Sequence, residues 1–343
     1  MVCNRDLRQL QVGPLLESYL TRRARRYPNA AFCPLFLNVR SSLHAGHVPP
    51  SAILLIVGAV ACFSMLDSIV KFLATRYSVP MLVWARYAVQ AIAIVLWLGP
   101  TMRSQLLRTR QLRLQLARGA ILLVSSLLFF NALKYLPLAE ATAINYTTPT
   151  LVILLSVVVL KERMTPPRWA FVAAGLAGML LIVRPSAAIL HSGALLALGA
   201  AGFYATFQIM TRKLSAEDPR VTLFYSALCG TALLTLVLPF VDQPAEMPWM
   251  HIALVGIMGV LGTAGHFLFI LAFRNAPASG LTPFTYMQIV WATLLGWGVF
   301  GHFPDAAALA GMAIIAGSGL LLAWHEHRRA PVLAETQEPT AID

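Results

Sequence analysis

Long apolar stretches separated by short polar connections make up most of the chain. A helix rises 1.5 Å per residue, so about 20 largely apolar residues are needed to cross a hydrocarbon layer of ~30 Å. The connections hold most of the proline and charge, as expected where the backbone meets water. The pattern predicts an all-α, polytopic membrane protein with ten transmembrane helices, at residues 52–74, 81–99, 117–134, 141–160, 168–184, 193–213, 221–240, 251–273, 281–300 and 306–324.

Composition agrees with this class. The chain has 343 residues, of which 58% are hydrophobic and only 12% charged. A soluble domain normally carries roughly 25% charged residues, so this chain lacks a water-facing surface. Its four cysteines have no metal-like spacing, and Cys62 and Cys229 fall inside predicted spans, where a free cysteine behaves as a small hydrophobe. We therefore expect neither a disulfide nor a metal site, and no cofactor.

The positive charge is distributed unevenly along the chain. A formal net charge of +12 would favour a nucleic-acid partner in a soluble protein. Here most Lys and Arg residues fall in alternate connections, including Arg103, Arg108, Arg110, Arg113 and Arg118 after the second span. This skew is the positive-inside pattern of membrane proteins. It predicts a protein of the inner (plasma) membrane with both termini in the cytoplasm, a lipid bilayer as its partner, and no nucleic acid.

The two ends of the chain differ from its apolar middle. Residues 1–50 are rich in arginine but lack the apolar core of roughly 7–15 residues that a signal peptide requires. We expect a disordered cytoplasmic tail there; an organellar transit peptide, or an extension upstream of the true start, is the alternative. Residues 328–343 are polar and are expected to form a second cytoplasmic tail.

The sequence repeats itself at an offset of 140 or 141 residues. Residues 132–146 (ALKYLPLAEATAINY) match residues 272–286 (AFRNAPASGLTPFTY), and each of the first five spans has a counterpart. The repeat pairs Asp67 with Gln208, Lys71 with Arg212, Arg86 with Ser226, Ser126 with His266, and Tyr146 with Tyr286. Because five is odd, the second copy must cross the membrane in the opposite sense. This predicts a 5+5 inverted repeat, residues 51–185 and 192–325, which in secondary transporters encloses a solute site near the midplane.

The repeated motif resembles a known family. The stretch ALKYLPLAEATAINYTTPTLVILLSVVVLKERMTPPRWAFVAAGLAGMLLIV is similar to the second part of an EamA-type repeat in the drug/metabolite transporter superfamily. The stretch ending WARY at Tyr87 resembles the second-helix pattern of that family. One departure is that the acidic residue after the fourth helix, Glu162, corresponds to His302 in the second copy. The resemblance implies a carrier. Members of the family export amino acids and other metabolites, or take up riboflavin or S-adenosylmethionine.

Two charged residues fall deep within predicted spans. Charge inside a bilayer is costly, so each is a functional candidate. Asp67 and Arg86 lie four residues from their span centres, about 6 Å to the outer side of the midplane. Together they predict a charged patch, with a carboxylate for an amine or proton and a guanidinium for a carboxylate or phosphate. The alternatives are a structural pair of Asp67 with Arg86 or with Lys71, and an Arg86 that extends to the outer surface.

The mirrored positions are neutral or weakly basic. Gln208 and His266 are expected at similar depth on the cytoplasmic side, which predicts a cavity charged outside and only polar inside. His266 is a candidate proton relay because histidine titrates near physiological pH; a histidine satisfied by helix packing is the alternative. It follows a row of glycines, Gly256, Gly259, Gly262 and Gly265, for which close helix packing is the favoured explanation over solute contact.

Aromatic and amide side chains on the second, fourth and ninth spans complete the candidate site. Trp84, Tyr146, Tyr286 and Gln288 are predicted to line it, with Asn145 and Trp291 as further candidates. The tyrosine pair is favoured because the repeat puts it at mirrored depths, although interfacial aromatics also face lipid. Pro149 is expected to unwind the fourth helix locally.

These features predict a secondary transporter rather than an enzyme. The favoured solute is a small amino-acid-like metabolite, cationic or zwitterionic, moved by alternating access and coupled to a proton, another ion or the solute's own gradient. An uptake carrier for a vitamin or cofactor is the alternative, and a channel or structural membrane protein the remote one. The sequence lacks metalloprotease and nucleophile-elbow motifs and a phosphate-binding loop. Direction of transport and oligomeric state stay open.

Overall fold

The computed structural model describes residues 49–160, 166–184, 192–214, 217–241, 246–276 and 278–335. Within these ranges the chain is helical and contains no strand. The first half holds α3 (Pro50–Leu73), α4 (Val79–Met102), η2 (Arg103–Leu107), α5 (Leu112–Tyr135), α6 (Leu138–Asn145), α7 (Thr148–Leu160) and α8 (Pro166–Val183). The second half holds α9 (Ser192–Lys213), α10 (Pro219–Val237), η3 (Leu238–Phe240), α11 (Trp249–Asn275), α12 (Ala278–Thr285), α13 (Met287–Phe300) and α14 (Ala306–Glu335).

The helices confirm an all-α, polytopic protein. Eight stretches among the described residues are long and apolar enough to cross a membrane. The fourth and ninth predicted spans differ, because each consists of two short helices, α6 with α7 and α12 with α13. Of the N-terminal tail predicted for residues 1–50, residues 1–48 lie outside the described ranges, as do Glu162 and the last eight residues. Helix α3 begins at Pro50, and α14 extends beyond its predicted end to Glu335.

The break between α6 and α7 has a local cause. Thr147 and Thr148 donate hydroxyl hydrogen bonds to the carbonyl oxygens of Ile144 (2.7 Å) and Asn145 (2.6 Å), which satisfies backbone acceptors at the end of α6. Pro149 is the second residue of α7, where its missing N–H costs nothing. The proline therefore marks the start of a new helix, and the unwound residues precede it.

Two opposite ends of the bundle can be defined by their contacts. At the Tyr77 end, the Tyr77 hydroxyl lies 2.6 Å from Nδ1 of His251 in the first turn of α11. At the Arg110 end, the backbone N–H of Arg110 donates to the Glu217 carboxylate (3.0 Å) just before α10. Thus α4 begins at the Tyr77 end and its repeat mate α10 begins at the Arg110 end.

The other long helices follow the same rule. Lys71, near the end of α3, donates to the Leu136 carbonyl oxygen (2.6 Å) just beyond α5, so both helices end at the Tyr77 end. Their mates begin there: α9 because Gly193 lies against Tyr135, and α11 because of the His251 contact. The mates α3 and α9, α4 and α10, and α5 and α11 therefore run in opposite directions.

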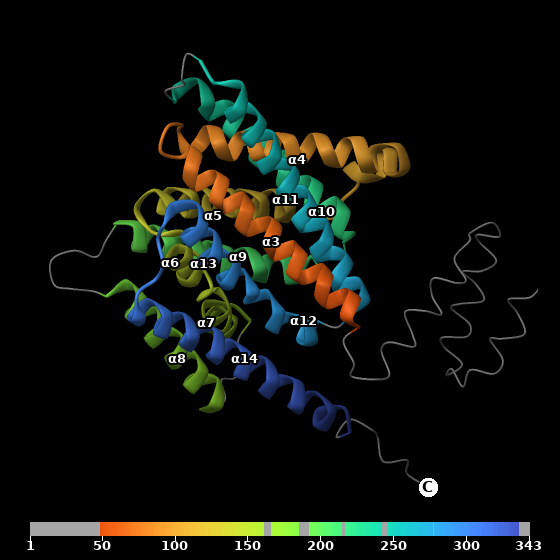
Figure 1. The fold of residues 1–343 in the computed structure, drawn as a ribbon. Coiled ribbons are helices and arrows are strands. Elements are labelled where there is room, and N and C mark those ends of the chain that lie inside the picture. Colours follow the sequence, from red (N-terminus) through yellow and green to blue (C-terminus); the bar gives the residue numbers. More distant parts are fainter. Residues whose placement is uncertain are drawn as a thin grey trace, which may run out of the picture.

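Contacts between helices are also mirrored. The pairing of α3 with α11 is matched by that of α5 with α9, and the pairing of α4 with α11 by that of α5 with α10. Helices α4 and α10 pack on each other, as do α6 and α13, and α8 and α14. Figure 1 shows α8 and α14 at one side of the molecule and α4 at the opposite side. The largest apolar core lies among α3, α4, α5, α10 and α11.

Close packing explains most of the glycine row on α11. A Cβ at Gly259 would lie 2.4 Å from the Val89 side chain, and one at Gly265 would lie 2.7 Å from the Phe63 ring. A Cβ at Gly262 would meet Leu66 at 3.2 Å. The predicted packing role is therefore confirmed for these three glycines, whereas nothing crowds Gly256.

Candidate functional site

The two helix breaks meet at a pair of tyrosines. Tyr146 follows α6 and Tyr286 follows α12, and their ring centroids lie 5.2 Å apart. The Tyr286 hydroxyl lies against α14, where a Cβ at Gly319 would be 1.6 Å away, so this position requires glycine. The repeat predicted that these tyrosines occupy mirrored positions. The structure adds that each lies where its own helix is interrupted.

A polar network joins this pair to α3. The Tyr146 hydroxyl donates to the carbonyl oxygen of Thr285 (2.6 Å) and to Oε1 of Gln288 (3.0 Å). Gln288 Nε2 in turn donates to Oδ2 of Asp67 at 3.4 Å, and Ser64 Oγ donates to the Gln288 backbone oxygen at 3.3 Å. The network thus brings together four of the predicted site residues, Asp67, Tyr146, Tyr286 and Gln288, from both halves of the chain.

Asp67 has no ion-pair partner among the described residues. Its side chain is buried, with 6% of its surface exposed. Lys71 donates to the carbonyl oxygens of Leu133 and Leu136 at the end of α5. Neither structural ion pair considered for Asp67 is formed, and within the described ranges Gln288 is the one residue whose side chain donates a hydrogen bond to this carboxylate.

Arg86 is buried and has no carboxylate partner in the described part of the chain. Its Nη1 donates weakly to Ser126 Oγ (3.5 Å), which also lies 3.0 Å from the Tyr87 hydroxyl. Its Nε is buried and has no hydrogen-bond partner among the residues that the structure describes. The guanidinium carbon lies 5.6 Å from the Phe130 ring centroid, within cation–π range. Arg86 therefore does not extend to the surface, and it has donors available for an anion.

The remaining predicted residues lie outside this network. His266 packs edge to face on Phe63, with ring centroids 5.0 Å apart. Gln208 is half-buried on α9 and makes no hydrogen bond with the described residues. Trp84 donates its indole N–H to Thr235 Oγ1 (2.9 Å) and links α4 to α10 at the Tyr77 end. A proton-relay role for His266 remains a prediction.

Sequence reasoning missed Arg118, which it assigned to a cytoplasmic connection. The side chain is buried within α5, with 6% of its surface exposed. Its Nε donates to Thr211 Oγ1 (2.7 Å), and its Nη1 donates to Ser226 Oγ (2.7 Å) and the Thr222 carbonyl oxygen (3.3 Å). Helix α5 begins at Leu112 rather than near residue 117, which places Arg118 almost two turns inside the helix. Because the span was predicted to start five residues too late, Arg118 was placed at the membrane interface, although its side chain is buried.

Comparison with known proteins identifies the family. The sequence matches the EamA-like transporter family over residues 50–184 and again over residues 191–324. The chain belongs to this family. The match confirms the resemblance seen in the repeated motif and covers both halves of the EamA-like chain.

Relatives of this EamA-like chain carry transporter names. A riboflavin transporter of Vibrio cholerae is 29% identical over 275 residues, which cover 78% of this chain and 91% of the relative. An S-adenosylmethionine uptake transporter of Rickettsia conorii is 26% identical over 267 residues, covering 76% and 88%. A crystal structure of another protein shares the fold, with a TM-score of 0.57, 23% identity, and coverage of 82% of this chain and 99% of the other.

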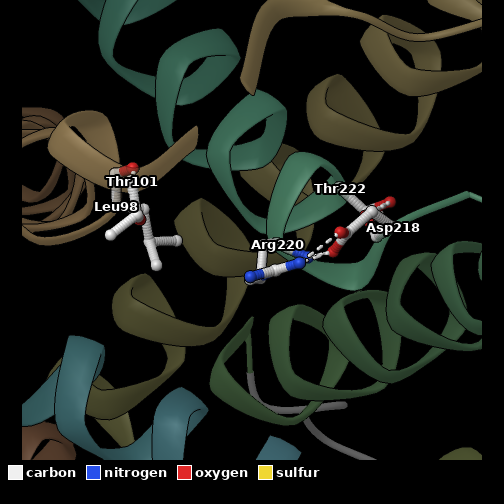
Figure 2. Close-up of polar contacts among 5 residues, drawn as sticks. All are labelled: Leu98, Thr101, Asp218, Arg220 and Thr222. Atoms are coloured by element: carbon white, nitrogen blue, oxygen red, sulfur yellow. Dashed lines mark hydrogen bonds and ion pairs between the residues drawn. The ribbon is translucent and has the colours of Figure 1, made fainter. Parts of the chain in front are cut away.

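The EamA-like chain also has a hollow away from the polar network. It lies between α4, α10 and α11, and its cavity volume is about 50 Å³. Arg220 is the charged residue of its lining, which consists of Ile94, Trp97, Leu98, Arg220, Leu223, Thr263, Phe267, Ile270 and Leu271. Figure 2 shows Arg220 paired with Asp218 at the start of α10, with Leu98 on the neighbouring helix. We call it the α4/α10 hollow; it lies toward the Arg110 end.

Proposed function

We propose that this chain is a secondary transporter that moves a small organic metabolite across the inner (plasma) membrane by alternating access. In this proposal the chain crosses the membrane ten times as a 5+5 inverted repeat, with both termini in the cytoplasm. Three observations support it: the family match in both halves, the opposite directions of three repeat-mate pairs, and the mirrored helix contacts. Secondary transporters recurrently use this plan, with the solute bound where the halves meet.

The observation that carries the proposal is the network at the two helix breaks. Asp67 and Gln288 come from different halves and meet beside Tyr146 and Tyr286, where both helices are interrupted. Irregular backbone at membrane depth is tolerated where it is buried in protein or lines a cavity. A polar network at such a point has the features of a transporter's solute site.

The side chains favour a solute that carries both charges. Asp67 lacks a cationic partner and Arg86 lacks an anionic one among the described residues. A zwitterion supplies an ammonium group to the first and a carboxylate to the second. An amino-acid-like solute fits, and so does S-adenosylmethionine, which bears an amino-acid group and a sulfonium cation. The relatives named for its uptake support this cofactor as the leading candidate.

Riboflavin is the second candidate. The relative that bears its name is 29% identical, and the tilted pair of Tyr146 and Tyr286 provides aromatic surface for a planar ring. A neutral flavin would leave the charges of Asp67 and Arg86 without a role in binding. The two candidates therefore predict different dependence on Asp67.

The test is uptake and counterflow in proteoliposomes with labelled S-adenosylmethionine, riboflavin and amino acids. Saturable counterflow is expected for one class, whereas linear flux without exchange would indicate a channel. Asp67→Asn should reduce transport of a cationic or zwitterionic solute about tenfold or more, since it removes a charge-assisted contact. Exposed Glu246→Gln is the matched control and should transport normally. Full transport of a confirmed cationic or zwitterionic solute by Asp67→Asn would contradict the site.

A further inference from the structure

The repeat is unequal at one charged position. Arg86 on α4 has Ser226 on α10 as its repeat mate, so the sequence provides a cation on one side of the centre and only a hydroxyl on the other. In the structure, however, Ser226 Oγ accepts a hydrogen bond from Arg118 Nη1 at 2.7 Å. A guanidinium from a different helix, α5, therefore lies at the position where the mirrored arginine would be. In the folded protein, therefore, a guanidinium lies on each side of the centre, although the sequence repeat places an arginine on one side only.

The two arginines have similar surroundings. Each is at least nine-tenths buried, with 8% of Arg86 and 6% of Arg118 exposed. Each meets a serine hydroxyl and an aromatic ring: Ser126 and Phe130 for Arg86, Ser226 and Phe207 for Arg118. Neither forms an ion pair with a described carboxylate.

Both cations have N–H donors without an acceptor in the described part of the chain. Arg86 Nε is buried without a partner, and Nη2 of each arginine makes no hydrogen bond with the described residues. Burying a charge without a counterion is costly. Among the described residues that are buried, Asp67 is the one carboxylate and Arg86 and Arg118 are the cations, so an excess of positive charge is left to be balanced. A carboxylate or phosphate group accepts the two parallel N–H bonds that a guanidinium offers.

The arginines lie at different levels of the bundle. Arg118 and Ser126, the hydroxyl that Arg86 contacts, are eight residues apart on α5, which corresponds to about 12 Å along the helix axis. Arg118 is nearer the Arg110 end and Arg86 is nearer the Tyr77 end. One anionic group would therefore meet a guanidinium on each side of the centre.

We propose that Arg118 is a second anion-binding residue of the transport path, the counterpart of Arg86 on the opposite side of the bundle. It binds the acid group, a carboxylate or phosphate, of the transported solute when the Arg110 end is open. Arg86 binds the same group when the Tyr77 end is open. The inference rests on the proposed transport function and narrows its solute class to molecules that bear an acid group.

Side-specific arginine labelling tests the position of Arg118 without a known solute. Right-side-out and inside-out membrane vesicles are treated with the water-soluble reagent 4-hydroxyphenylglyoxal, and modified peptides are quantified by mass spectrometry. Exposed Arg76 and Arg108 report reagent access at the Tyr77 and Arg110 ends, respectively. Arg118 should be modified only from the face that labels Arg108, and Arg86 only from the face that labels Arg76. If Arg118 stays unmodified while Arg108 is fully modified, it is a structural residue and the proposal is wrong.

Transport assays then test the chemistry. S-adenosylmethionine is compared with its decarboxylated analogue in wild type, Arg118→Gln, Arg118→Lys and the exposed control Arg108→Gln. Wild type and the control should prefer the acid-bearing compound at least tenfold, and Arg118→Gln should lose that preference while still moving the analogue. An unchanged preference in Arg118→Gln would overturn the proposal. If wild type moves none of the tested solutes, the proposed solute class fails, whereas the labelling result still decides the role of Arg118.

Discussion

The two ends of the α4–α10 pair are built from repeat-equivalent residues but are packed differently. At the Tyr77 end, Val83, Leu123, Phe130 and Leu234 are at most 5% exposed and belong to one apolar core. Their repeat mates at the Arg110 end are Leu223, Thr263, Ile270 and Ile94, all of which line the α4/α10 hollow. Ile94 is as buried as its mate and belongs to the same core, whereas the other three are only partly buried. One end of the pair is therefore closed and the other is partly open.

Two physical differences account for this contrast. The Arg110 end has smaller side chains at two positions, Thr263 in place of Leu123 and Ile270 in place of Phe130. At the Tyr77 end, a hydrogen bond between Trp84 and Thr235 joins α4 to α10. The Arg110 end has no equivalent bond, because the repeat mates of these residues, Phe224 and Val95, are apolar. The repeat therefore preserves the path of the backbone, while a few lining residues determine which end packs tightly. Under alternating access, the hollow would be the open side of the path.

The largest loss of stability is expected when two core residues at the closed Tyr77 end are replaced by the residue types of their repeat mates at the Arg110 end. Leu123→Thr combined with Phe130→Ile removes buried volume from a packed core and buries a hydroxyl. We expect a loss of stability of about 2–4 kcal/mol, since large-to-small core substitutions cost this much. The measurement is the midpoint of thermal unfolding in detergent.

The reciprocal exchange is the matched control. Thr263→Leu combined with Ile270→Phe adds side-chain volume where the hollow leaves space. It should leave stability unchanged or raise it by about 1 kcal/mol, because filling a cavity stabilises. It should also slow transport if the hollow is part of the path. If both exchanges destabilise the protein equally, the two ends are not packed differently and the contrast is wrong.

The next largest loss of stability is expected where α4 and α10 cross, between the two ends. A Cβ at Gly230 on α10 would lie 2.6 Å from the Tyr87 ring on α4. Because both groups are held by packed helices, Gly230→Ala should cost about 1–3 kcal/mol through overpacking. Gly202, which has nothing within 4 Å of its added Cβ, is the control: Gly202→Ala should not destabilise. A normal unfolding temperature for Gly230→Ala would show that the two helices can separate at their crossing.

A smaller loss of stability is expected when the hydrogen bond between Trp84 and Thr235 at the closed Tyr77 end is removed. Trp84→Phe removes the hydrogen bond to Thr235 but keeps an aromatic ring, so it should lower stability by about 0.5–1.5 kcal/mol. It should also increase the reactivity of a cysteine introduced by Leu234→Cys, a buried position beside that hydrogen bond. Trp97→Phe at the open end is the control. No gain in cysteine reactivity would mean that the hydrogen bond does not hold this end closed.

The sequence predicted the long helices better than it predicted the site. Hydropathy locates helices such as α3 and α11 because a backbone in lipid must satisfy its own hydrogen bonds and bury apolar side chains. The approach of Asp67 to Gln288, 221 residues apart, depends on how the two halves pack, and only the repeat gave a hint of it. Arg118 was missed because charge near a predicted span end is usually interfacial. Gln115, three residues earlier and also buried, was an available signal of a polar face on α5.

The smallest effect is expected where α8 packs on α14. These helices cross where Gly178 and Gly311 meet, and a Cβ on either would lie within 2.8 Å of the other's carbonyl oxygen. At one end Arg184 forms an ion pair with Asp305, and at the other Phe171 packs on His325 with ring centroids 5.9 Å apart. The backbone N–H of Ala308 and the Arg184 guanidinium both lower the pKa of Asp305, which precedes α14.

The sign of the pH effect follows from that shift. A carboxyl group whose pKa is lowered by folding stabilises the folded state above its ordinary pKa, and this contribution is lost as the pH falls through the lowered value. The midpoint of thermal unfolding should therefore decrease slightly on acidification below about pH 4, and Asp305→Asn should reduce that dependence. The change should be small, because both side chains are more than half exposed. A variant as acid-sensitive as the wild type would show that the ion pair contributes nothing measurable, and that packing at the glycine crossing and between Phe171 and His325 holds α8 against α14.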